Sequence, residues 1–262
     1  MPLLRETRGG VGVLTLSRPD SRNAWGQDYN EGLPAAFAEW AVDPAIRCVV
    51  VTGDPAGGAF SAGADMKNPA THAERTPGEF VDMLSAPRSS VTAMPESFPK
   101  PVIAAVNGYA IGNSCIFSFS CDLIVASDRA EWRLPQVSLG IIPAYGGSLR
   151  LARHIGKGNA MRLALGFPLK ADEALRQGLA QWVVPHDQLM QQAFEVADRI
   201  ATLPPIAARL AKESLVRGLD AATLSDAALS DVYRVSVLER TEDAKEAHKA
   251  WREKRKPVFQ GR

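Results

Sequence analysis

The chain has 262 residues, of which 46% are hydrophobic and 23% charged, and its formal net charge is +1. These are ordinary globular values, and a chain of this length buries a substantial core without disulfides or a structural metal. A net charge so close to zero creates no long-range field that would attract nucleic acid or a membrane surface, so we expect neither as a partner.

The composition also argues against a metal site and against secretion. The three cysteines and four histidines show none of the spacings typical of metal ligands. An odd number of thiols without a framework suits a reducing compartment. Charged residues follow the start at once, and the apolar stretch 102–111 is too short to span a bilayer. We therefore expect a cytoplasmic protein with no bound metal.

The first part of the chain alternates predicted strands and helices. Residues 11–16 predict a strand, and a helix is expected over about 27–40. Further strands are predicted at 46–52, 101–106 and 122–126. Helical segments lie between several of these strands, and such alternation is typical of an α/β fold.

From about residue 188 the pattern predicts helices alone. They are expected over 188–200, 206–216, 221–238 and 241–255. The chain therefore divides into an α/β core over residues 1–187 and a helical region over residues 188–262. Within the core, segment 68–99 is rich in Pro, Thr, Ser and Glu, which predicts a mobile helix-loop region.

Two glycine-containing segments directly follow predicted strands or their loops. They are Ala59-Phe-Ser-Ala-Gly-Ala-Asp-Met-Lys67 and Asn107-Gly-Tyr-Ala-Ile-Gly-Asn-Ser-Cys115. Small residues at a turn let backbone N–H groups approach a ligand, and a helix beginning near Asn113 would add its dipole. Two such turns side by side would direct two N–H groups at one oxygen, as an oxyanion hole does. Either segment alone is better explained as a tight turn, which is the commonest use of glycine.

Taken in order, the segments resemble the enoyl-CoA hydratase/isomerase family of the crotonase superfamily. Ser61-Ala-Gly-Ala-Asp-Met-Lys67 resembles its first oxyanion segment, and Ala105-Val-Asn-Gly-Tyr-Ala-Ile-Gly112 resembles its second. Cys121-Asp-Leu-Ile-Val-Ala-Ser127 and Leu139-Gly-Ile-Ile-Pro143 follow in family order. The resemblance covers nearly the whole chain.

The resemblance implies a crotonase-like spiral of ββα units with a C-terminal helical region that assembles homotrimers or dimers of trimers. It implies an acyl-CoA thioester as ligand, with coenzyme A as part of the substrate and no permanently bound cofactor. At matching positions, the N–H groups of Ala64 and Asn113 are the oxyanion donors. The residues matched to coenzyme A binding are Arg22, Ala24, Ala62, Ala64, Asp65, Met66 and Lys67.

Two positions depart from the hydratase pattern. Hydratases of this family carry one glutamate three residues after the second donor and another twenty residues later. Here these positions hold Ile116 and Gln136, neither of which can accept and return a proton near neutral pH. Asn113 itself stands where most relatives have glycine. We therefore expect decarboxylation, carbon–carbon cleavage, isomerisation or an atypical hydration instead of standard hydration.

Gln136 and Tyr145 are the candidates for shaping the reacting end. The amide of Gln136 would orient a water or hold a carbonyl. The phenol of Tyr145 can hydrogen-bond a carboxylate or donate a proton, or its ring can simply pack against the acyl pocket. Three further residues border the expected pocket and would be alternative bases: His72, Glu74 and Glu79.

Two other carboxylates and two other classes of function remain open. Asp65 and Asp122 sit at element ends, where an aspartate more often bonds nearby N–H groups than takes part in chemistry. A non-catalytic acyl-CoA-binding protein would have kept the cradle and lost the acid-base pair. A plain α/β interaction scaffold would bind no ligand at all.

Overall fold

A six-stranded sheet forms the centre of the computed structural model, which describes residues 2–67, 76–79, 81 and 91–262. Within these residues its strands are, in spatial order, β1 (Leu3–Arg8), β2 (Val11–Leu16), β3 (Cys48–Gly53), β5 (Val102–Val106), β7 (Leu123–Ser127) and β10 (Trp182–Val184). β1 and β2 pair antiparallel and the other neighbours pair in parallel. Every residue of β3 and β5 is buried, which explains their continuous apolar sequences.

A smaller sheet lies beside it and includes a short strand from each of the two glycine segments. In the described part of the chain its order is β4 (Ala59–Ser61), β6 (Tyr109–Ile111), β8 (Glu131–Arg133) and β9 (Leu169–Lys170). Consecutive strands are shared between the sheets, because β3, β5 and β7 join the large one whereas β4, β6 and β8 join the small one. The chain therefore winds as repeated strand pairs, and the predicted α/β fold is confirmed.

Two helices cover opposite faces of the large sheet. α1 (Gln27–Val42) packs its buried side chains with Val49 and Val51 of β3, whereas α7 (Leu189–Ala201) packs against Val50. This division follows from the alternation of side chains along a strand. Helix α7 therefore packs on the large sheet, although it lies beyond residue 187, where the predicted helical region begins.

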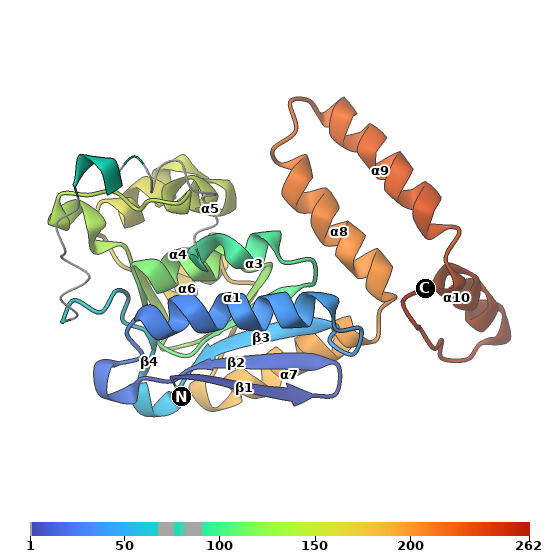
Figure 1. Cartoon of the computed structure of the whole chain (residues 1–262), viewed down its shortest axis with the longest axis horizontal. Helices are drawn as coiled ribbons and strands as arrows, with labels where there is room; N and C mark the ends of the chain where they lie inside the picture. The colour runs from blue at the N-terminus through green and yellow to red at the C-terminus, as the bar shows by residue number, and fades with distance from the viewer. Residues whose placement is uncertain (1, 68–75, 80, 82–90) are drawn as a thin grey trace.

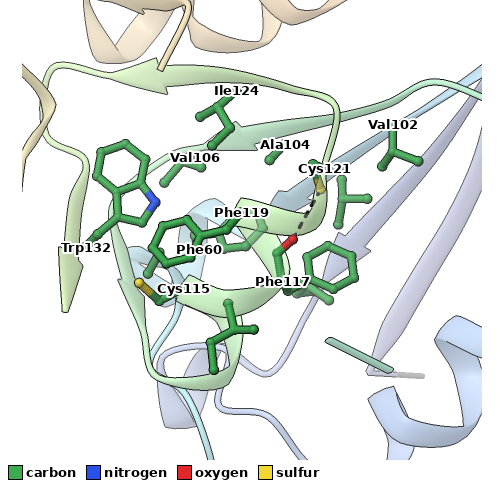
Figure 2. Packing of buried hydrophobic residues seen from close by; sticks show 14 of the residues in the cluster. Phe60, Val102, Ala104, Val106, Cys115, Phe117, Phe119, Cys121, Ile124 and Trp132 are labelled. Carbon is green, nitrogen blue, oxygen red and sulfur yellow. Dashed lines mark hydrogen bonds between the residues drawn. The ribbon is translucent and has the colours of Figure 1, made fainter. Parts of the chain in front are cut away.

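Helix α4 (Asn113–Ser120) runs through the core beside both sheets. All its residues after the first are buried. Figure 2 shows Phe117 and Phe119 of this helix among Phe60 and Trp132 from the small sheet and Val106 from the large one. Because packing surrounds the helix, its first residue, Asn113, has a rigid support.

The remaining elements connect and flank this core. They are the helices α3 (Met94–Ser97), α5 (Gly147–Ala164) and α6 (Ala171–Arg176), and the 3₁₀ turns η1 (Pro19–Ser21), η2 (Pro55–Gly57), η4 (Val91–Ala93), η5 (Pro135–Leu139) and η6 (His186–Gln188). Much of the predicted mobile segment 68–99 lies outside the described residues, and its last part forms η4 and α3.

The C-terminal helices are α8 (Pro205–Gly218), α9 (Leu224–Leu238) and α10 (Glu242–Glu253). Figure 1 shows them to one side of the sheets, with α8 and α9 running alongside each other. No residue of α9 is buried. Across the residues that are described, no helix combines the length and apolar character needed to cross a membrane.

Candidate active site

The two glycine segments meet where β4 and β6 end. The strands pair in parallel through Ala59 with Tyr109 and Ser61 with Ala110. Just beyond, a Cβ on Gly63 would lie 2.5 Å from the Ile111 carbonyl oxygen and 3.7 Å from the Gly112 Cα. Only glycine permits that approach, and Gly63 also has a positive φ of 79°. The structure thus brings the predicted segments together.

The hydroxyl of Ser114 ties the segments to each other. Its Oγ donates to the buried Ser61 carbonyl at 2.7 Å and accepts from the Ile111 N–H at 2.9 Å. Ser114 is fully buried, so these bonds are shielded from water. Ser114 directly follows Asn113 in the sequence, but nothing in the sequence pattern assigns it this structural role.

Neither of the two N–H groups predicted as oxyanion donors is used in a hydrogen bond among the described residues. Ala64 bridges to Trp25, but the bonds of that bridge use the Gly63 carbonyl and the Asp65 N–H. Asn113 is the first residue of α4, where N–H groups have no intrahelical acceptor, and the cap residue Gly112 supplies no side-chain bond. Among the described residues, neither N–H has an acceptor. Such donors remain available to a ligand.

The residues matched to coenzyme A binding lie on two loops that run side by side. The Ala62 N–H donates to the Arg22 carbonyl at 3.0 Å. The Trp25 N–H donates to the Gly63 carbonyl at 2.7 Å, and the Asp65 N–H donates back to Trp25 at 3.0 Å. The loop around residues 22–25 is therefore fixed against the loop that carries Ala64.

An arginine outside the predicted set holds this arrangement. Arg18 donates through Nη2 to Asp65 Oδ2 at 2.8 Å and through Nη1 to the Ala24 carbonyl at 3.0 Å. The Arg18 hydrogen bond lowers the pKa of the Asp65 carboxyl, so Asp65 is a charged structural partner. Arg18 and Asp65 carry opposite charges, but they are 47 residues apart, and no spacing along the chain pairs them.

The outer edge of these loops faces solvent. Arg22, Met66 and Lys67 are exposed, whereas Ala24 is buried. Exposed cations beside open backbone are suited to the phosphates of a nucleotide. The predicted residues of the two loops thus lie together, and the cations Arg22 and Lys67 are on their solvent-exposed side.

Ile116 fills the position of the first hydratase glutamate with an apolar side chain. It is 1% exposed and belongs to the main hydrophobic cluster. A Cβ on Gly147 would lie 2.8 Å from its Cγ1, so Ile116 packs closely against the start of α5. An isoleucine side chain has no group that transfers a proton, so this position cannot act as an acid or a base.

Gln136, at the second glutamate position, points its amide toward the second segment. It lies in η5 and is 9% exposed. Its Nε2 is 3.6 Å from the position that a Cβ would take on Gly112. Its Oε1 is buried and has no hydrogen-bond partner among the described residues. The structure therefore places Gln136 beside the residue that precedes Asn113.

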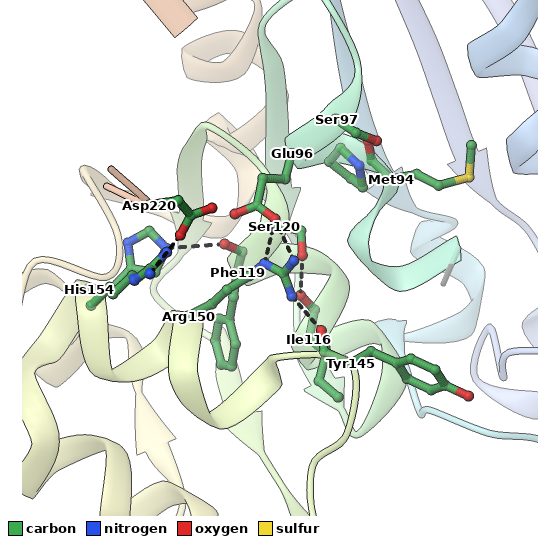
Figure 3. A network of polar contacts seen from close by, with 12 residues as sticks. Met94, Glu96, Ser97, Ile116, Phe119, Ser120, Tyr145, Arg150, His154 and Asp220 are labelled. Atoms are coloured by element: carbon green, nitrogen blue, oxygen red, sulfur yellow. Dashed lines mark hydrogen bonds and ion pairs between the residues drawn. The ribbon is translucent and has the colours of Figure 1, made fainter. Parts of the chain in front are cut away.

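Tyr145 occupies a constrained turn just before Gly147, which packs against Ile116. Its φ of 55° lies in the left-handed region, which is uncommon for an aromatic residue. Arg150 holds the turn, because its Nη1 donates to the Tyr145 carbonyl while its Nε donates to Glu96 at 2.9 Å. In Figure 3 the Tyr145 ring extends away from the Glu96–Arg150 pair, and the residue is 54% exposed.

The other residues considered as acids or bases from the sequence have structural contacts or lie outside the described residues. Asp122 accepts from the Val102 N–H at 2.7 Å and pairs with Lys212 at 2.7 Å, which occupies its carboxylate. Glu79 accepts from the Thr76 N–H and hydroxyl. His72 and Glu74 lie outside the described part of the chain.

Comparison with known sequences and structures identifies the family and agrees with the α/β architecture. Residues 6–262 match the family model described as enoyl-CoA hydratase/isomerase. A "Probable enoyl-CoA hydratase" of Rhizobium meliloti (strain 1021) is 39% identical over 261 residues, which cover 99% of this chain and 98% of that protein. The 2,3-dehydroadipyl-CoA hydratase of Escherichia coli (strain K12) is 35% identical, with 95% of each chain covered.

A solved structure is similar over the full length of the chain. The enoyl-CoA hydratase from Bacillus anthracis superposes with a TM-score of 0.91 at 32% identity, and the match covers 100% of both chains. The similarity thus includes the C-terminal helices as well as the two sheets. This chain belongs to the enoyl-CoA hydratase/isomerase family and has the crotonase fold.

Proposed function

We propose that the chain is an enzyme that binds an acyl-CoA thioester and stabilises its enolate in an oxyanion hole. The N–H groups of Ala64 and Asn113 would donate to the thioester carbonyl oxygen. The observation that carries this proposal is that both N–H groups lack an acceptor within the described part of the chain, although their segments are fixed to each other through Ser114. Donors fixed before the substrate arrives cost no reorganisation when charge develops.

Coenzyme A would bind along the two loops that hold Arg22, Ala24, Ala62, Ala64, Asp65, Met66 and Lys67. Their joined backbones offer a continuous strip, and the exposed Arg22 and Lys67 suit its phosphates. Coenzyme A would then enter and leave as part of the substrate, with no permanently bound cofactor. The three free cysteines suit work in the reducing cytoplasm.

The reaction we propose is a lyase or isomerase step other than standard hydration. Hydration needs groups that deliver and remove protons, and Ile116 and Gln136 supply none. Decarboxylation, carbon–carbon cleavage and isomerisation all pass through an enolate that the two N–H groups would stabilise. Tyr145 would hydrogen-bond the departing or migrating group from its constrained turn.

A non-catalytic acyl-CoA-binding protein is the alternative function. The closely packed apolar Ile116 favours it, because this position could not regain a proton-transfer role without repacking. Such a protein would bind saturated, unsaturated and malonyl-type thioesters without turnover. Turnover that depends on Tyr145 or Gln136 would exclude it.

Replacing Ala64 by proline tests the oxyanion assignment. Proline has no N–H, and the backbone bonds of the Trp25–Ala64 bridge do not use the N–H of Ala64. Enolate-forming turnover, followed by mass spectrometry across a panel of acyl-CoA thioesters, should fall about a hundredfold or more. Ala64→Gly keeps the N–H and serves as the control. An unchanged rate in Ala64→Pro would overturn the assignment.

A further inference from the structure

Tyr145 has a backbone conformation that its own side chain disfavours. Its φ is 55° and that of Gly146 is 78°, so two consecutive residues lie in the left-handed region. Glycine adopts this region freely, whereas the same conformation costs free energy in a residue with a Cβ. Such residues persist only where the surrounding structure imposes the conformation, and they gather at functional sites. The turn at Tyr145 is therefore a candidate for a functional constraint.

The guanidinium of Arg150 imposes the conformation. Its Nη1 donates to the Tyr145 carbonyl and lies 2.7 Å from the position that a Cβ would take on Gly146. The guanidinium thus packs against the backbone of both left-handed residues. While it stays there, only glycine fits at position 146.

Glu96 fixes this guanidinium from the other side. Both Nε and Nη2 of Arg150 donate to its Oε2, the first at 2.9 Å. Figure 3 shows the guanidinium between Glu96 and the Tyr145 turn, and only 18% of the Arg150 side chain is exposed. Helix α3, which carries Glu96, is itself held, because Lys212 donates to the Pro95 carbonyl at 2.6 Å. Arg150 therefore cannot turn away from Tyr145 without breaking charge-assisted hydrogen bonds.

The turn is also fixed relative to the helix that begins at Asn113. A Cβ on Gly147 would lie 2.8 Å from Ile116 Cγ1, so the start of α5 rests on α4 one helical turn beyond Asn113. The phenol of Tyr145 is left available, since its hydroxyl bonds to no residue in the part of the chain that the structure describes. The contacts on both sides of the turn thus determine where this phenol leaves the backbone relative to α4.

We infer that Glu96 and Arg150 are positioning residues for the reaction, because their ion pair holds the turn that presents the Tyr145 phenol to the substrate. Neither residue would touch the acyl-CoA. Both act through the backbone of Tyr145, whereas the loops expected to bind coenzyme A are held by hydrogen bonds of their own. This inference rests on the proposed function and adds two residues to it.

Turnover of the acyl-CoA that the wild-type enzyme converts fastest tests the inference. Arg150→Met should lower kcat up to about a hundredfold, as expected when a reacting group is misplaced by about 1 Å. The dissociation constant of a non-reacting acyl-CoA, measured by calorimetry, should stay unchanged. Tyr145→Phe should also lower kcat, and the double variant should be no slower than the slower single variant, because Arg150 acts through the phenol.

Variants of the acid separate positioning from a general loss of structure. Glu96→Gln keeps an oxygen that accepts from the guanidinium and should retain most of the activity that Glu96→Ala loses. Arg162→Met removes a solvent-exposed hydrogen bond to Glu173 further along α5; it is the control and should change neither kcat nor affinity.

The geometry of the turn has a readout that does not depend on activity. In crystal structures of Arg150→Met and Glu96→Ala, Tyr145 should leave the left-handed region, whereas in Arg162→Met its φ should stay near the 55° of the wild-type chain. A left-handed Tyr145 in both of the first two variants would overturn the inference, because the ion pair would then not hold the turn.

Two kinetic outcomes would also overturn the inference. One is a double variant in which the losses of Arg150→Met and Tyr145→Phe multiply. The other is a loss in Arg150→Met that lies in acyl-CoA affinity while kcat is kept. A wild-type protein that binds acyl-CoA thioesters and converts none is a different result, because it would overturn the enzymatic function itself and with it the role of the pair.

Discussion

Ser114 shows how one side chain can set the geometry of a whole site. Its hydroxyl spans from the carbonyl of Ser61, at the end of β4, to the N–H of Ile111, before α4. Backbone pairing between β4 and β6 covers only a few residues. The separation of the Ala64 and Asn113 N–H groups therefore depends on this buried hydroxyl.

Ser114→Ala should weaken both folding and acyl-CoA binding. The buried Ser61 carbonyl and Ile111 N–H would lose their partner, which costs about 1–3 kcal/mol in the free energy of unfolding. The loosened segments should also bind acyl-CoA less tightly, as calorimetry would measure.

Ser118→Ala is the matched control for this change. Ser118 is also buried on α4, but its hydroxyl donates to the Cys115 carbonyl and accepts from Trp132 Nε1. Neither partner lies in β4 or in the turn before α4. Ser118→Ala should destabilise the fold and spare acyl-CoA affinity; equal loss of affinity in both variants would contradict the role given to Ser114.

The sequence predicts the role of a single residue only where neighbouring positions along the chain determine that role. Ala64 and Asn113 were identified because each stands at a fixed place in a recognisable segment. The bond from Ser114 to Ser61 depends on how distant segments pack, and so does the Gln136 Oε1, which has no partner in the part of the chain that the structure describes. No spacing along the chain carries that information.

At the scale of the element, α8 is anchored to the body of the protein by one lysine. Lys212 is 7% exposed and pairs with Asp122 at 2.7 Å. It also donates to the carbonyls of Pro95 at 2.6 Å and Lys100 at 3.0 Å. Burial lowers the pKa of Lys212 and raises that of Asp122, so each depends on the other to stay charged.

Lys212→Met should therefore be costly. It leaves the largely buried Asp122 carboxylate, whose side chain is 20% exposed, beside a neutral side chain and removes the donor from two carbonyls. Breaking a buried pair from one side costs about 3–5 kcal/mol, measured as the free energy of unfolding in urea. Arg217→Met on the same helix removes an exposed pair with Glu213 and should cost less than about 1 kcal/mol. Similar losses in the two variants would contradict the anchoring role.

The elements that the sequence predicts well are the long ones. The helix at 188–200 and the strand at 11–16 agree with α7 and β2 to within a residue or two, because their apolar patterns are long enough to show a period. The strands of the small sheet have only two or three residues each. Such strands exist because a neighbour pairs with them, so no local pattern identifies them.

For the whole molecule, the C-terminal helices present an unusual surface. Six large apolar side chains of α9 are exposed in the single chain: Leu224, Leu229, Val232, Tyr233, Val235 and Val237. The sequence predicts these helices from their period but does not reveal that this apolar surface is uncovered. Exposed apolar side chains gathered on one helix in this way are typical of an interaction surface. We therefore retain the prediction of a homotrimer or a dimer of trimers built through residues 188–262.

Light scattering coupled to size-exclusion chromatography tests this prediction. The wild-type protein should elute with the mass of a trimer or of a dimer of trimers, and Val232→Glu should shift it toward the monomer, because a symmetric interface would bury an unpaired carboxylate from every copy. Val42→Glu is the control, since Val42 is equally apolar and 83% exposed but lies at the end of α1. Circular dichroism should show that both variants keep their helices. A wild-type monomer, or a mass unaffected by Val232→Glu, would contradict assembly through α9.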